Sequence, residues 1–128
     1  MSLRSPLGAV LGQGAAGDGP KHWWTQRVTA VALVPLSLWF VHALVRLPLA
    51  DHAAVSFWIG SGLNPVLLSL LLVALCWHSK LGVQVVVEDY VHGRGMRLVV
   101  LLASSALHVL LATGGVYAVL RIALGGTA

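Results

Sequence analysis

The stretch Val28–Val45, VTAVALVPLSLWFVHALV, contains no charged residue and is bounded by Arg27 and Arg46. As a helix it would span about 27 Å, close to the roughly 30 Å hydrocarbon core of a bilayer. Pro35 lies inside the stretch, and a kink at such a proline is tolerated in a membrane bundle. The stretch therefore predicts a membrane-spanning helix with a cation at each end.

Two more apolar stretches follow it. The second runs from about Leu63 to Val87 and ends at an acidic pair, and the third runs from Leu98 to Leu120 between Arg97 and Arg121. All three are continuous, whereas the strands of a lipid-facing barrel alternate between apolar and polar residues. We predict an all-α integral membrane protein with three transmembrane helices, at about residues 27–47, 63–88 and 96–121.

Composition agrees with this class. Of the 128 residues, 58% are hydrophobic and 9% are charged, and the mean hydropathy is +0.87. Soluble domains have about 25% charged residues. The net charge of +4 does not indicate nucleic-acid binding, because the basic residues form no cluster. The single cysteine, Cys76, allows no intrachain disulfide and cannot by itself hold an iron–sulfur cluster.

The flanking charges predict how the chain lies in the membrane. The tail and the second connection carry Arg4, Lys21, Arg27, Arg94 and Arg97, and the opposite ends carry only Arg46 and Arg121. The positive-inside rule then places the N-terminus in the cytoplasm and the C-terminus in the periplasm. We expect residues 1–22 to be a flexible cytoplasmic tail rather than a signal peptide, because its apolar run is too short. Residues 23–128 would form the transmembrane domain.

The second stretch carries the strongest candidate site. At helical spacing His78, Gly82 and Asp89 share one face, with His78 near mid-membrane and Asp89 roughly 16 Å further along. A neutral imidazole at that depth suits an axial haem ligand, and a glycine one turn away lets a flat ring approach the backbone. The alternative interpretation is a histidine bonded to a neighbouring helix and a glycine that permits tight packing.

A second histidine offers a competing ligand. His108 lies about as deep in the third stretch as His78 does in the second, so a haem held between the two within one chain is a rival interpretation. Gly114 and Gly115, on the same stretch, are interpreted as helix-packing residues rather than as part of a site.

The residues around His78 resemble a known family. The run His78–Val91, HSKLGVQVVVEDYV, is similar to the signature of the small hydrophobic anchor subunits of succinate dehydrogenase. That signature is a histidine, a glycine four residues later, a glutamine two after that, and then Asp-Tyr-Val. Arg27-Val28-Thr29-Ala30 and Arg97, at the heads of the first and third helices, also match. The resemblance covers the chain from about Trp23 onward.

The resemblance implies a role for four residues. His78 would ligate the iron of a b-type haem shared with a companion cytochrome b anchor subunit, which supplies the second histidine. Tyr90 would donate a hydrogen bond to ubiquinone, and Asp89 would orient the quinone site. Arg27 would lie near the haem propionates or the quinone. The chain would have no catalytic residue of its own.

The resemblance also implies partners and a location. An iron–sulfur subunit and a flavoprotein subunit would dock on the cytoplasmic side. The membrane would be the bacterial inner membrane or its mitochondrial equivalent.

Other interpretations stay open from sequence. Tyr90 could be an interfacial aromatic, Asp89 a solvated helix-end carboxylate and Arg27 a topology anchor. Lys80 could extend to the membrane surface or pair with a propionate. The chain could also belong to a quinol:fumarate reductase, or it could be a membrane scaffold with no cofactor.

Overall fold

Four helices account for nearly all of residues 19–125, the part of the chain that the computed structural model describes. They are α2 (Gly19–Arg46), α3 (His52–Gly60), α4 (Asn64–Tyr90) and α5 (Arg94–Ala123). These residues contain no strand, and α2, α4 and α5 are each long and apolar enough to cross a membrane. The predicted all-α fold with three transmembrane helices is confirmed.

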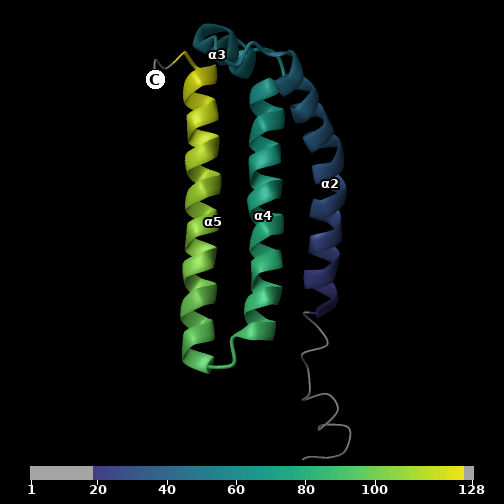
Figure 1. The fold of residues 1–128 in the computed structure, drawn as a ribbon, viewed down its shortest axis with the longest axis vertical. Helices are drawn as coiled ribbons and strands as arrows, with labels where there is room; N and C mark the ends of the chain where they lie inside the picture. Colours follow the sequence, from purple (N-terminus) through teal and green to yellow (C-terminus); the bar gives the residue numbers. More distant parts are fainter. Residues whose placement is uncertain (1–18, 126–128) are drawn as a thin grey trace, which may run out of the picture.

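The three long helices stand in a row with α4 in the middle (Figure 1). α4 packs against α2 on one side and against α5 on the other, and α2 and α5 do not pack against each other. The start of α2 and the connection from α4 to α5 lie at one end of the row, and α3 and the end of α5 lie at the other (Figure 1). The three long helices therefore form an open layer in which α4 is the one that packs against both of the others.

Few side chains within residues 19–125 are buried by other residues of the chain. The buried apolar side chains within residues 19–125 are Ala43, Leu68, Leu71, Leu81, Val87 and Val119. Most large apolar side chains on the three long helices are exposed instead. In a membrane these surfaces contact lipid or other subunits, because apolar area is not excluded from lipid as it is from water.

The structure corrects two details of the sequence prediction. α2 begins at Gly19 rather than near residue 27, so residues 19–22 of the predicted tail are helical. The rest of that tail, residues 1–18, lies outside the described residues. Pro35 lies within α2 without ending it, and the helix curves along its length (Figure 1).

The second correction is α3, a short helix that the sequence prediction omitted. Asp51 caps its start, because the Asp51 carboxylate accepts hydrogen bonds from the backbone N–H groups of Ala53 and Ala54 at 2.9 and 3.2 Å. At its other end the Asn64 side chain donates to the Trp58 carbonyl at 2.7 Å. The Trp58 ring also stacks on Trp39 of α2, with 5.6 Å between ring centroids. α3 thus ties the first two spans together at one end of the bundle.

Candidate functional site

His78 lies on the side of α4 that faces α2. Its Nδ1 is 3.0 Å from Oγ1 of Thr29, and this contact joins the two helices. Nε2 of the same ring has no hydrogen-bond partner within residues 19–125. In this part of the chain, Gln26 Oε1 is the one side-chain nitrogen or oxygen that is both buried and without a hydrogen-bond partner. Nε2 of His78 also has no partner, so it is not buried. His78 therefore has one nitrogen anchored and the other open.

Gly82 and Gln26 face each other across the contact between α2 and α4, which we call a seam, one turn from His78. A Cβ atom placed on Gly82 would lie 4.0 Å from Nε2 of Gln26, which is ordinary van der Waals distance. Gln26 Oε1 is buried and accepts no hydrogen bond. Buried polar atoms are nearly always paired, so this oxygen indicates a donor that residues 19–125 do not supply.

These features fit a haem ligand site. A neutral imidazole with a free Nε2 is the usual proximal donor to haem iron. Sequence reasoning identified His78 and Gly82 but missed Thr29 and Gln26 as neighbours. The available signal was their spacing, because polar residues at positions 26 and 29 of an apolar helix lie on one face.

His108 occupies a different seam, between α4 and α5. Its Nε2 is 3.1 Å from Oγ of Ser79, and its Nδ1 is 2.7 Å from the Ser104 carbonyl. Both ring nitrogens are therefore engaged inside the chain. His78 contacts α2 instead, so the two histidines do not share a seam. This arrangement argues against the rival interpretation of an intrachain haem between them.

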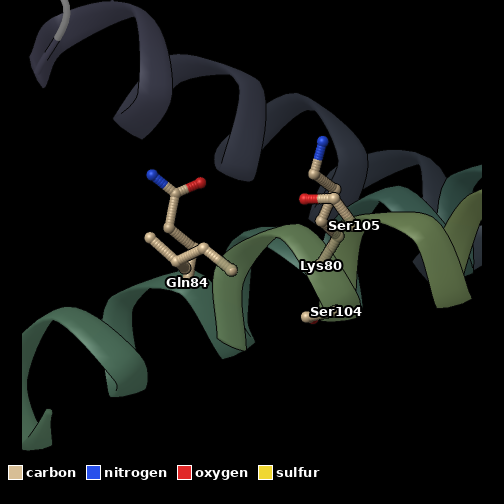
Figure 2. A pocket seen from close by; sticks show the side chains of 5 residues that line it. Lys80, Gln84, Ser104 and Ser105 are labelled. Carbon is tan, nitrogen blue, oxygen red and sulfur yellow. The ribbon is translucent and has the colours of Figure 1, made fainter. Parts of the chain in front are cut away.

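Lys80 faces the α5 side of α4, away from the contact between His78 and α2. A cavity of about 210 Å³ is lined by Lys80, Gln84, Leu101, Ser104 and Ser105, and Figure 2 shows these side chains from the two helices. Gln84 also donates to the Glu88 carboxylate at 2.8 Å. The glutamine of the signature thus belongs to the polar seam between α4 and α5 in this chain.

The remaining predicted site residues lie toward the end of the bundle where α4 stops. Tyr90 is the last residue of α4 and is 78% exposed, and Asp89 beside it is also exposed. The Arg27 guanidinium carbon lies 5.2 Å from the centroid of the Trp23 ring. No hydrogen bond or ion pair among residues 19–125 joins Arg27 to Asp89 or Tyr90. The structure brings His78 together with Thr29 but does not bring Arg27 together with the acidic end of α4.

Comparisons with known proteins identify the family of the chain. Residues 1–112 match the family model described as succinate dehydrogenase/fumarate reductase transmembrane subunit. A succinate dehydrogenase hydrophobic membrane anchor subunit of Rickettsia bellii is 29% identical over 101 residues, which cover 79% of this chain and 81% of that protein. A succinate dehydrogenase membrane anchor subunit of Reclinomonas americana is 31% identical over 85 residues, covering 64% of this chain and 71% of that protein.

A third relative extends over nearly the whole chain. The succinate dehydrogenase hydrophobic membrane anchor subunit of Paracoccus denitrificans is 26% identical over 125 residues, or 98% of this chain and 96% of that protein. No solved structure matches the chain. The chain has three apolar spans, and the family model matches most of its length. The relative from Paracoccus denitrificans aligns with it over nearly the full length of both chains. The chain belongs to the family of succinate dehydrogenase/fumarate reductase transmembrane subunits.

Proposed function

We propose that this membrane anchor subunit serves a succinate dehydrogenase, supplies His78 as one axial ligand of a haem b, and helps form a ubiquinone site with Tyr90 and Asp89. The observation that carries the proposal is the His78 ring, held at Nδ1 by Thr29 and open at Nε2. The relatives named above are succinate dehydrogenase subunits, which favours this enzyme over a quinol:fumarate reductase.

The open row of helices supports a haem that is shared between subunits. α4 offers one histidine on its α2 side, and the second candidate, His108, lies in the contact between α4 and α5. The second axial ligand would come from the companion cytochrome b subunit. Bound at His78, the haem would supply reversible one-electron chemistry. His78 would hold the iron, and Gly82 would keep the adjacent backbone free of a side chain.

The end of α4 supports the quinone role. The Tyr90 hydroxyl is exposed and can donate one hydrogen bond to a quinone carbonyl, and Asp89 adds an acceptor beside it. Arg27, on the first turns of α2, would place a cation near the haem propionates or the quinone. An acid is unfavourable at a helix C-terminus, so Asp89 is better explained by a partner or ligand than by helix stability.

We infer the remaining partners from the family to which the chain belongs. The iron–sulfur and flavoprotein subunits would dock at the end of the bundle that holds Arg27 and Tyr90, and this end would face the cytoplasm of a bacterium or the equivalent mitochondrial compartment. The exposed apolar faces of α2, α4 and α5 would contact the companion subunit and membrane lipid. Residues 23–128 would act as the anchor domain, with the preceding residues at the docking side.

The decisive experiment compares two histidine variants in the assembled complex. His78→Ala should remove haem b or weaken its binding severely, whereas His108→Ala should retain it, because both nitrogens of His108 are bonded within the chain. The reduced-minus-oxidised optical spectrum measures haem content, and immunoblots of the other subunits measure assembly. A normal haem band in the His78 variant, or loss of the band only in the His108 variant, would refute the assignment.

A further inference from the structure

The Thr29 hydroxyl sits among three polar partners and has a single proton to donate. Its Oγ1 is 2.9 Å from the Thr25 carbonyl, 3.0 Å from the Gln26 carbonyl and 3.0 Å from Nδ1 of His78. A carbonyl oxygen can only accept a hydrogen bond, and a hydroxyl can donate one and accept two. The bond to His78 is therefore tied to how the hydroxyl proton is used within α2.

One arrangement of these protons leaves a lone pair on Nε2 of His78, as haem ligation requires. The hydroxyl donates to the carbonyls of its own helix, as threonine commonly does in a helix, and its oxygen accepts from Nδ1–H of His78. The imidazole is then the tautomer with the proton on Nδ1 and the lone pair on Nε2. In the opposite tautomer the Thr29 hydroxyl would donate to Nδ1, and the proton on Nε2 would leave no lone pair there for iron.

We propose that Thr29 is a positioning residue that fixes the tautomer and orientation of His78, so that Nε2 presents its lone pair to the haem iron. This inference rests on the haem ligation proposed above. Metal-bound histidines generally donate their second N–H to a neighbouring acceptor, which raises the basicity of the ligand. Here the acceptor comes from another helix of the same chain, 49 residues away. Packing of α2 on α4 thereby sets the state of the ligand.

The chain contains a matched control for this role. The Thr113 hydroxyl on α5 makes the same intrahelical bonds, to the Val109 carbonyl at 2.8 Å and to the Leu110 carbonyl at 3.3 Å, but within residues 19–125 it makes no hydrogen bond to a histidine. If Thr29 served only its own helix, removing its hydroxyl would have the same effect as removing that of Thr113. A difference between the two positions therefore reports the bond to His78.

The test uses the purified, assembled complex with Thr29→Val, Thr29→Ala, Thr29→Ser and Thr113→Val. The first two remove the hydroxyl, with and without the branched shape, and the serine variant keeps it. Loss of the acceptor lowers the basicity of the imidazole and destabilises ferric relative to ferrous haem. The haem midpoint potential should rise, by about 59 mV for each tenfold change in that relative affinity. The serine and Thr113 variants should keep the wild-type potential and spectrum.

The outcomes separate this inference from the proposed function. If His78→Ala lacks haem while Thr29→Val and Thr29→Ala keep the wild-type potential and haem spectrum, the role of Thr29 is refuted and the ligation stands. If the haem midpoint potential of Thr29→Ser shifts as much as that of Thr29→Val, the role of Thr29 is also refuted, because the hydroxyl would then be irrelevant. Loss of haem in the valine and alanine variants, with retention in the serine and Thr113 variants, would support it. Haem retained in His78→Ala would refute the ligation itself.

Discussion

A single hydroxyl distinguishes the two interpretations of Tyr90. The side chain is 78% exposed at the end of α4, which suits both an interfacial aromatic and a group that reaches a ligand. An aromatic ring serves the first role with or without its oxygen, because the ring provides most of the interfacial affinity. A hydrogen bond to a quinone carbonyl depends on the oxygen alone. The two roles can therefore be separated by removing one atom.

Tyr90→Phe should leave assembly and haem content unchanged and weaken quinone reduction. A hydrogen bond contributes on the order of 0.5–1.5 kcal/mol, and about 1.4 kcal/mol corresponds to tenfold, so we expect a several-fold to tenfold loss of kcat/KM for quinone. Succinate oxidation with a dye that accepts electrons before the quinone provides the internal control. Equal quinone activities for the Phe variant and the wild type would show that Tyr90 is an interfacial aromatic residue and does not bind quinone through its hydroxyl.

Residue contacts within one helix could be predicted from the sequence, and contacts between helices could not. The face shared by His78 and Gly82 follows from helical spacing alone. The contact between His78 and Thr29 depends on how α2 rotates and shifts against α4. The spacing of Gln26 and Thr29 indicates a polar face of α2, but it does not determine which residues of α4 that face contacts. For the same reason Lys80 could not be assigned to the seam with α5 before the structure was known.

At the scale of elements, the long helices were predictable and the short one was not. Eighteen or more apolar residues indicate a span, whereas α3 has nine residues between two connections and no strong periodic pattern. The early start of α2 was missed because the prediction placed the first helix boundary at Arg27. The helix instead continues through Trp23 and Trp24, whose rings lie 6.1 Å apart by centroid.

The pair Gly114-Gly115 tests the packing of α5 on α4. The expected packing role holds for Gly115, where an added Cβ would lie 3.0 Å from Cδ1 of Leu72, and not for Gly114, where no atom lies within 4 Å. Gly115→Leu should destabilise the subunit by about 1–3 kcal/mol through overpacking, and Gly114→Leu should be tolerated. Thermal stability of the complex in detergent measures both. Similar losses for the two variants would contradict this packing.

At the scale of the molecule, the distribution of charge matches the ends of the bundle seen in Figure 1. The start of α2 and the connection from α4 to α5 lie together, so Lys21, Arg27, Arg94 and Arg97 belong to one end. Arg46 and Arg121 belong to the other end, near α3. The sequence predicted that the start of the first span and the connection between the second and third spans lie at the same end, and the structure agrees for the residues that it describes.

The same segregation predicts orientation. A phosphatase reporter that is active only in the periplasm should be active when fused to the C-terminus and inactive when inserted at Gly93–Gly95, because Arg94 and Arg97 oppose translocation of that connection. A cytoplasmic reporter at the same two positions should give the opposite pattern. Periplasmic activity at Gly93–Gly95 would place Tyr90 on the wrong side for the proposed docking of the other subunits.

The open row of helices also affects how the chain is made. Ribosomes add about 5–20 residues per second, so His78 is added roughly 2–10 s after Thr29. During that interval α2 has been synthesised, but α4, the long helix that packs against it, has not. Gln26 and Thr29 must then face lipid, the insertion machinery or another subunit. The polar side chains of α2 at this contact are therefore without their partner helix until α4 has been synthesised.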